Sequence, residues 1–295
     1  MLTRIALKLI AATAVLPLSW VRLLGKWLGW FLYAVVTSRR RVVQTNLKLC
    51  FPGWSDARVQ DATKETFVRF AQAWLDRGWL WHGSERVIRE RLQLAGDLSV
   101  LQGQEPLILF APHFVGLDAG WTALTFLIQR RFSTIYTDQA NKVSDAWILR
   151  GRRRFGDCQL FGRIEGVKPI LQGLKAGNPL YLLPDMNFGP EESVFVPFYG
   201  VPAATVPSLS RFAKLTRAKV VPVISTMTAE GYVVEVLPVW QGFPTVDQVA
   251  DTALMNARLQ TYIDAMPTQY YWVHKRFKTR PEGAHAVYKK AEISR

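Results

Sequence analysis

The apolar positions of this chain follow two patterns, short uninterrupted runs and longer stretches in which apolar residues recur every three or four positions. Uninterrupted runs predict buried strands, and the three-to-four spacing predicts helices that bury one face. The predicted strands are residues 107–111, 133–136, 180–183, 219–226 and 232–237. The predicted helices are residues 56–92, 117–129, 143–155, 167–174, 207–216 and 252–265. This alternation predicts an α/β fold, a mixed sheet flanked by helices.

The first 38 residues have a different pattern, with two apolar stretches separated by basic residues. Residues 9–21 and 27–38 are uncharged, and each is shorter than the about 20 residues that a membrane-spanning helix needs. If Lys8 and Arg22 extend toward lipid headgroups, residues 5–24 are long enough to span. A pair of helices lying in the membrane interface fits equally well. A cleaved signal peptide is disfavoured, because no A-x-A site follows and apolar residues resume at Trp27. We therefore expect residues 1–38 to be a helical membrane anchor and residues 39–295 to form the second domain.

The net charge of +14 is concentrated at the two ends of the chain. Residues 1–55 contain eight lysines or arginines and no acidic residue, whereas the stretch 56–273 is almost neutral. Basic charge beside apolar segments is attracted to an anionic membrane surface. Nucleic acid is the competing partner for such a basic protein, but no nucleic-acid-binding motif is present and we expect none to bind. The two cysteines are too few for a disulfide framework, and no cluster of metal ligands appears, so we expect no metal and no cofactor.

One histidine and one aspartate follow the predicted strand 107–111. His113 and Asp118 lie in the sequence Ala-Pro-His-Phe-Val-Gly-Leu-Asp. Residues five apart turn about 500° along a helix, so the two side chains can meet only if His113 lies in a loop and Asp118 in the first turn of the next helix. A histidine held by a carboxylate can act as a general base near neutral pH. The same residues also fit an ordinary loop histidine and an aspartate that caps a helix.

Several further motifs, in order along the chain, resemble one family. They are Asn-Leu-x-x-Cys-Phe-Pro at residues 46–52, Gly-Arg-Arg-Arg at 151–154, Pro-Asp-Met-Asn-Phe-Gly at 184–189 with Val-Phe-Val-Pro-Phe at 194–198, and Trp-Val-His-Lys-Arg-Phe-Lys-Thr-Arg-Pro at 272–281. Together with the His-x4-Asp pair they resemble the lipid A biosynthesis lauroyl/myristoyl acyltransferases, a group within the lysophospholipid acyltransferase superfamily. Some members have glutamate where this chain has Asp118.

The resemblance implies a function and roles for the site residues. It implies transfer of a fatty acyl chain from acyl carrier protein to a hydroxyl of a lipid A precursor, at the cytoplasmic face of the bacterial inner membrane, with residues 39–295 as the acyltransferase domain. His113 would be the general base and Asp118 the carboxylate that orients it. Arg152 would stabilise the oxyanion formed at the thioester, unless it belongs to a solvated basic cluster with its neighbours. The expected substrate-binding residues are Asp185, Arg154, Lys275 and Arg276.

Two other functions remain open from the sequence. Another lipid acceptor, such as a lysophospholipid or an aminolipid, would use the same chemistry at His113. A non-catalytic membrane-binding protein with the same fold is a different class, and the presence of both His113 and Asp118 argues against it. Asp185 follows a predicted strand, where α/β sheets place ligand sites, but it also fits a turn before Gly189.

Overall fold

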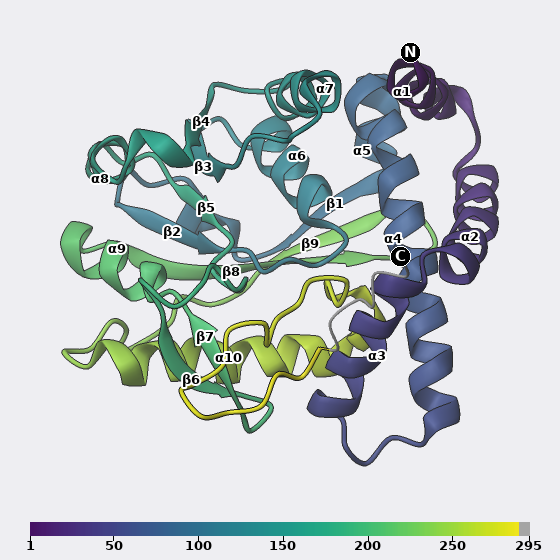
Figure 1. Cartoon of the computed structure of the whole chain (residues 1–295). Helices are drawn as coiled ribbons and strands as arrows, with labels where there is room; N and C mark the ends of the chain where they lie inside the picture. Colours follow the sequence, from purple (N-terminus) through teal and green to yellow (C-terminus); the bar gives the residue numbers. More distant parts are fainter. Residues whose placement is uncertain (289–295) are drawn as a thin grey trace.

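Seven strands form one mixed sheet at the centre of the molecule (Figure 1). The computed structural model describes residues 1–288. In order across the sheet, the strands are β1 (Leu92–Gly96), β9 (Tyr232–Val236), β8 (Lys219–Met227), β2 (Leu107–Phe110), β5 (Leu180–Leu182), β3 (Phe132–Tyr136) and β4 (Cys158–Gly162). All neighbouring strands are parallel except β8 and β9, which are antiparallel. The α/β fold with a mixed sheet is therefore confirmed.

Ten α-helices and one hairpin surround this sheet within the described residues. The helices are α1 (Leu2–Ala12), α2 (Leu18–Val35), α3 (Thr37–Cys50), α4 (Asp56–His82), α5 (Glu85–Arg91), α6 (Leu117–Leu127), α7 (Lys142–Arg152), α8 (Lys168–Lys175), α9 (Ser208–Thr216) and α10 (Gln248–Ala265). The hairpin consists of β6 (Val194–Phe198) and β7 (Val201–Thr205). The prediction of a single helix over residues 56–92 is wrong in one respect. Helix α4 ends at His82, a second helix, α5, begins at Glu85, and Leu92 is the first residue of strand β1.

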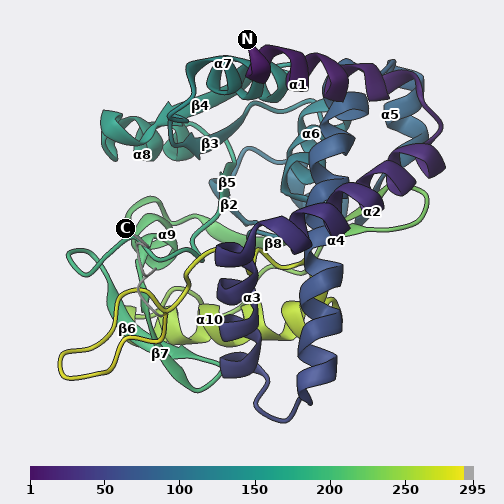
Figure 2. The ribbon, with the colours of Figure 1, turned by 45° about the vertical axis from the view of Figure 1, so that its right-hand side comes forward.

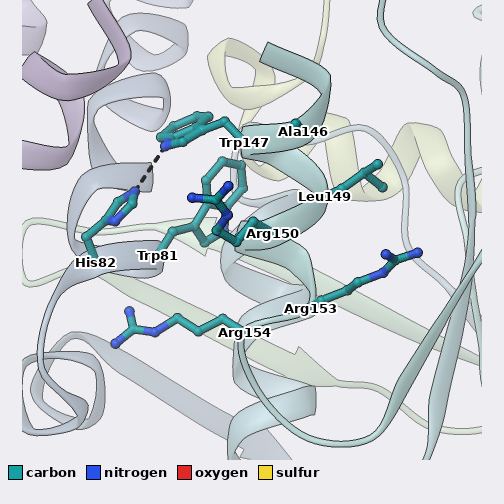
Figure 3. Close-up of a pocket in the computed structure, with 9 residues that line it drawn as sticks. Trp81, His82, Ala146, Trp147, Leu149, Arg150, Arg153 and Arg154 are labelled. Carbon is teal, nitrogen blue, oxygen red and sulfur yellow. Dashed lines mark hydrogen bonds between the residues drawn. The ribbon is translucent and has the colours of Figure 1, made fainter. Parts of the chain in front are cut away.

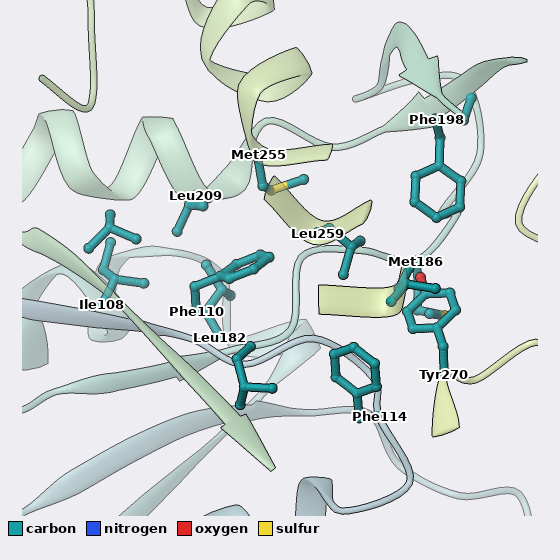
Figure 4. Packing of buried hydrophobic residues seen from close by; sticks show 14 of the residues in the cluster. Ile108, Phe110, Phe114, Leu182, Met186, Phe198, Leu209, Met255, Leu259 and Tyr270 are labelled. Carbon is teal, nitrogen blue, oxygen red and sulfur yellow. The ribbon is translucent and has the colours of Figure 1, made fainter. Parts of the chain in front are cut away.

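Alternate residues of the central strands divide the core into two layers. Ile108 and Phe110 of β2 face a cluster that includes residues of α9, α10 and the β6–β7 hairpin (Figure 4). Leu107 and Leu109 face the opposite cluster, which includes residues of α4, α6 and α7. Because both faces of the sheet are covered, its central strands β2 and β5 are buried at every position, as the sequence runs indicated. The catalytic candidates lie where these strands end.

Helices α1 and α2 lie against α4 rather than apart from the body (Figure 2). Helix α2 buries only a narrow stripe, Val21, Gly25 and Gly29. A Cβ atom at Gly29 would lie 2.5 Å from the Cα of Val68, so glycine is what allows the two helices to approach this closely. The remaining surface of α2 faces outward and carries exposed Trp20, Leu23, Leu24, Trp27, Leu28 and Phe31.

A buried polar cluster also joins α2 to the body. Arg22 of α2 donates to the carboxylate of Asp76 in α4, which is fully buried. Tyr232 donates to the same carboxylate over 2.6 Å, and Trp79 over 2.9 Å. Residues 1–38 thus contain part of the folded body as well as its exposed apolar surface.

Two expectations about the ends of the chain remain without structural support. Among residues 1–288, none of the helices combines the length and the apolar character that crossing a membrane requires. The final residues of the range expected for the acyltransferase domain, 289–295, lie outside the described residues.

Candidate active site

His113 lies in the loop between β2 and α6, as its spacing predicted. The loop backbone is held by the C-terminal segment, since Tyr271 donates its N–H to the His113 carbonyl over 3.0 Å and Val115 donates to Gln269 over 2.8 Å. Gly116 closes the turn before α6, where a Cβ atom would lie 2.9 Å from the Ser225 carbonyl oxygen. A segment more than 150 residues away in the sequence therefore fixes the backbone of His113.

The carboxylate that contacts His113 belongs to Asp185, in the loop that follows β5. His113 Nδ1 lies 2.8 Å from Asp185 Oδ1, and the His113 backbone N–H donates to Oδ2 over 3.1 Å. Tyr270 donates its hydroxyl to Oδ2 over 2.9 Å. Because an ionised carboxylate only accepts hydrogen bonds, the proton of a neutral His113 lies on Nδ1, and Nε2 carries the free lone pair.

The environment of Asp185 keeps it ionised. Its side chain is fully buried, and burial alone would raise its pKa. The charge of His113 and the hydrogen bonds from His113 and Tyr270 outweigh burial and hold the pKa of Asp185 below its usual value. Burial, followed by the charge of Asp185, raises the pKa of Tyr270 well above its ordinary value, so its hydroxyl remains a donor. The His113 side chain, 22% exposed, is the part of this group open to a substrate.

Asp118 has different partners from those we expected. It lies in the first turn of α6, as predicted, and it is buried, but its carboxylate pairs with two arginines. Arg77 Nε lies 2.8 Å from Oδ2, and Arg152 Nε lies 2.9 Å from Oδ1. The expectation that Asp118 orients His113 is therefore corrected, because Asp185 makes that contact. Burial opposes ionisation of Asp118, but the charges of Arg152 and Arg77 hold its pKa below the usual value.

Arg152 is the member of its basic cluster that points into the body. Trp121 donates its indole N–H to the Arg152 carbonyl over 2.7 Å, and the guanidinium uses Nε for Asp118. Its two terminal nitrogens make no hydrogen bond within residues 1–288. Arg154 instead donates to the carbonyls of Leu80, over 3.0 Å, and Gly83, at the end of α4. The structure thus gives Arg154 a packing role and leaves Arg152 able to meet a substrate.

Two of the other expected substrate-binding residues are enclosed by the protein. Arg276 is 1% exposed and donates to the Ala204 carbonyl over 2.8 Å and to the Thr205 hydroxyl over 2.6 Å. It holds the β6–β7 hairpin and has no surface to offer a substrate, which corrects its expected role. Asp185 is equally buried and acts on His113. Lys275 is half-buried, with its ammonium 5.6 Å from the ring centre of Tyr288.

The sequence patterns did not reveal two partners of these aspartates, Tyr270 and Arg77. Tyr270 and Arg77 were not singled out, although Tyr270 lies two residues before the Trp272 motif. His274, inside the 272–281 motif, accepts the Asn187 backbone N–H at its Nε2 over 3.1 Å. Burial, the charge of His113 and the charge of Arg276 lower the pKa of His274 to about 4, so it is neutral at pH 7. It supports the loop that carries Asp185.

The arrangement supplies a base and a separate cationic group. Within residues 1–288, no three histidine, cysteine, aspartate or glutamate side chains are grouped to hold a metal ion. His113 Nε2 can accept a proton, and the free end of Arg152 can stabilise negative charge. No nucleophilic side chain is among the contacts of His113. This set fits direct transfer between two bound substrates.

Comparison with known proteins agrees with this chemistry over nearly the whole chain. Residues 1–279 match the family described as bacterial lipid A biosynthesis acyltransferase. A lipid A biosynthesis acyltransferase of Haemophilus influenzae is 31% identical over 88% of this chain and 81% of its own length. A myristoyltransferase of lipid A biosynthesis from Escherichia coli is 30% identical over 90% of this chain and 83% of its own. A lauroyltransferase from the same organism is 29% identical over 92% of this chain and 90% of its own. The motifs, the fold and these relatives together show that the chain belongs to the bacterial lipid A biosynthesis acyltransferases.

Proposed function

We propose that this enzyme transfers a fatty acyl chain from the thioester of acyl carrier protein to a hydroxyl of a lipid A precursor. The observation that carries the proposal is the His113–Asp185–Tyr270 chain of hydrogen bonds, which prepares Nε2 of a partly exposed histidine as a base. The family supplies the acceptor class, since the similar proteins of Haemophilus influenzae and Escherichia coli are named for lipid A biosynthesis.

The proposed reaction needs one proton carrier and no covalent enzyme intermediate. His113 Nε2 takes the proton of the acceptor hydroxyl as its oxygen attacks the thioester carbonyl, and Asp185 stabilises the imidazolium that forms. The tetrahedral intermediate carries its negative charge on the former carbonyl oxygen. It collapses to the ester and breaks the carbon–sulfur bond, and the imidazolium returns its proton to the thiolate that leaves.

Arg152 is the proposed group for the oxyanion. Asp118 fixes its Nε, which leaves both terminal nitrogens aimed by a buried ion pair. Arg77 shares Asp118, so two guanidinium charges meet one carboxylate and a net positive charge remains. Asp118 is a positioning residue in this mechanism.

The test is a transfer assay with the purified full-length protein and a lipid A precursor as acceptor. We expect product with the mass of the precursor plus one acyl group, formed from acyl carrier protein thioester and lost in His113→Ala. Faster transfer from acyl-coenzyme A than from acyl carrier protein would contradict the proposal that acyl carrier protein is the donor. Transfer to a lysophospholipid in preference to the precursor would contradict the acceptor.

We also propose that α1 and α2 attach the enzyme to the cytoplasmic face of the inner membrane while lying along its surface. Their inner side is fixed to α4, and the outer side presents large apolar residues, among them Trp27, which is 60% exposed, and Phe31, which is 61% exposed. Lys8, Lys26 and the run Arg39-Arg40-Arg41 add positive charge next to this surface. Apolar area and basic charge together are what an anionic bilayer interface binds.

Flotation with liposomes of anionic phospholipid tests this attachment. Trp27→Glu with Phe31→Glu should move the protein from the liposome fraction to the soluble fraction. The matched control is Leu215→Glu with Val246→Glu, two exposed apolar residues elsewhere on the body. Equal loss of flotation in both variants, or none in either, would contradict the proposal.

A further inference from the structure

A second cationic site lies on the other side of α7 from Arg152. A cavity of about 740 Å³ opens between the end of α4 and α7. Its lining includes Trp81 and His82 of α4, Trp147 and Arg150 of α7, and Arg154, which lies two residues after the end of α7. Figure 3 shows Arg150 extending toward the pair formed by His82 and Trp147, whereas Arg153 points away from them.

The aromatic wall of this cavity is fixed before any ligand arrives. Trp147 donates its indole N–H to His82 Nε2 over 3.0 Å, and the two rings are nearly parallel. Trp81 packs edge-on against Trp147, with ring centres 4.5 Å apart. Gly151 makes this packing possible, since a Cβ atom there would lie 2.2 Å from the Trp81 ring. The glycine of the Gly-Arg-Arg-Arg motif therefore builds the floor of the cavity.

The charges around the cavity are unbalanced. Arg150 makes no hydrogen bond or ion pair within the described residues, and no acidic side chain is among those that line the cavity. Glu85 lies near Arg154 and compensates part of its charge. Burial lowers the pKa of the His82 imidazole, and the positive charges of Arg154 and Arg150 lower it further. An unpaired guanidinium such as that of Arg150 is stabilised when an anion binds beside it.

The cavity also lies beside the apolar helices. Helix α1 packs against α7, and Asn141 at the start of α7 donates to the Thr3 hydroxyl over 3.1 Å (Figure 2). Exposed Leu2, Ile5 and Leu9 of α1 belong to the surface proposed above to meet the bilayer. An anion that reaches this cavity from the membrane surface is a lipid headgroup.

We infer that the cavity between α4 and α7 binds a phosphate group carried by a membrane lipid, with Arg150 as its main ligand and Trp147 as the wall against which the headgroup rests. Phosphate matches the fork of donors of a guanidinium, and an aromatic face suits the apolar side of a headgroup. The purpose of this cavity rests on the proposed function: it would hold the phosphorylated acceptor while the acceptor hydroxyl reaches His113. Binding itself can be measured without turnover.

The binding experiment uses full-length His113→Ala protein with ¹³C-labelled histidine and short-chain phosphatidic acid as the probe. We expect a saturable shift of the His82 signal and no shift with the matching diacylglycerol, which lacks phosphate. Arg150→Gln should weaken binding about tenfold or more, because a charge-assisted hydrogen bond is lost. Arg217→Gln is the control, with the same charge change at an exposed arginine outside the cavity, and should bind as before. Equal affinity in both variants, or binding of diacylglycerol, would overturn the inference.

Kinetics in the wild-type background distinguish the source of the phosphate. If the acceptor supplies it, Arg150→Gln raises the KM for lipid A precursor and leaves kcat unchanged. If bulk phospholipid supplies it, the same variant loses affinity for phosphatidic acid vesicles and keeps its KM for acceptor in detergent. A rise in the KM for acyl carrier protein alone would overturn the inference and assign Arg150 to the donor. Because none of these outcomes depends on His113 being the base, failure here leaves the proposed reaction intact, and failure of His113→Ala to stop turnover leaves the binding result intact.

Discussion

The two buried aspartates of the candidate site, Asp185 and Asp118, differ in the kind of side chain that donates hydrogen bonds to each of them. Asp185 accepts from a histidine, which can lose its proton, and from a tyrosine, which is neutral. Asp118 accepts from Arg77 and Arg152, whose charges are permanent at any physiological pH. A carboxylate with a titratable partner makes a base, whereas a carboxylate with two fixed cations makes a rigid positive site. The pairing of an aspartate therefore says more about its role than its distance in sequence from the catalytic histidine.

The largest expected effect comes from removing the charge of Asp185. Asp185→Asn should lower kcat by a factor of about 10² or more, because the histidine loses both its tautomer control and the stabilisation of its imidazolium. The measurement is kcat with acyl carrier protein donor, with circular dichroism to confirm the fold. A decrease smaller than that of Asp118→Asn would reverse the assignment of the two aspartates.

Removing the charge of Asp118 should act first on stability. Asp118→Asn leaves two half-buried arginines facing each other without a counter-ion, and breaking a buried ion pair costs about 3–5 kcal/mol. Urea unfolding of wild type and variant gives this difference. Asp56→Asn, which breaks an exposed pair with Lys48, is the control and should change the free energy of unfolding far less. Equal losses at the two positions would contradict the buried cluster.

The lowered pKa of His274 predicts a loss of stability at a higher pH than the one at which either aspartate titrates. Its pKa is about 4 in the folded protein and about 6.5 when unfolded, so only the unfolded chain takes up this proton between those values. The contribution of His274 to the free energy of unfolding has its full value above pH 6.5. It falls by roughly 3 kcal/mol as the pH drops from 6.5 toward 4. Unfolding free energies at pH 7 and pH 4.5 measure it. His274→Gln, which keeps an acceptor for Asn187, should reduce that difference, and an unchanged difference would contradict the assignment.

The smallest effect separates the hydrogen bond that Asp185 accepts from Tyr270 from those it accepts from His113. Tyr270→Phe removes one donor from the carboxylate and leaves the contact with His113 in place. We expect kcat to fall about tenfold, which corresponds to the about 1.4 kcal/mol of one hydrogen bond to a charged group, with little change in KM. A loss as large as that of Asp185→Asn would show that Tyr270 acts directly on the substrate.

The sequence predicted the centre of the fold better than its edges. β2, β3, β5 and β8 are buried on both faces, so their apolar runs stand out from their surroundings. β1 and β4 are edge strands with several partly exposed positions, and β6 and β7 each contain a proline. None of these four strands therefore appears in the sequence as an uninterrupted apolar run. The loop position of His113 and the helical first turn of Asp118 followed from local spacing and are confirmed.

The pairing of the site residues could not be read from local spacing. Asp185 lies 72 positions from His113 and reaches it only because β2 and β5 are neighbours in the sheet. Tyr270 comes from a segment still further along, and Arg77 from a helix whose apolar and aromatic pattern indicated only core packing. Asp118 is close to His113 in sequence, yet the start of α6 directs it toward α4 and α7. Strand order, which the sequence did not reveal, decided the site.

A double-mutant cycle on His113 and Asp185 tests the central claim most directly. If Asp185 acts through His113, the losses in kcat/KM of His113→Ala and Asp185→Asn are not additive, and the double variant is no slower than His113→Ala alone. The account predicts this result in the transfer assay with acyl carrier protein thioester and lipid A precursor. Additive losses, or turnover by His113→Ala near that of the wild type, would contradict it.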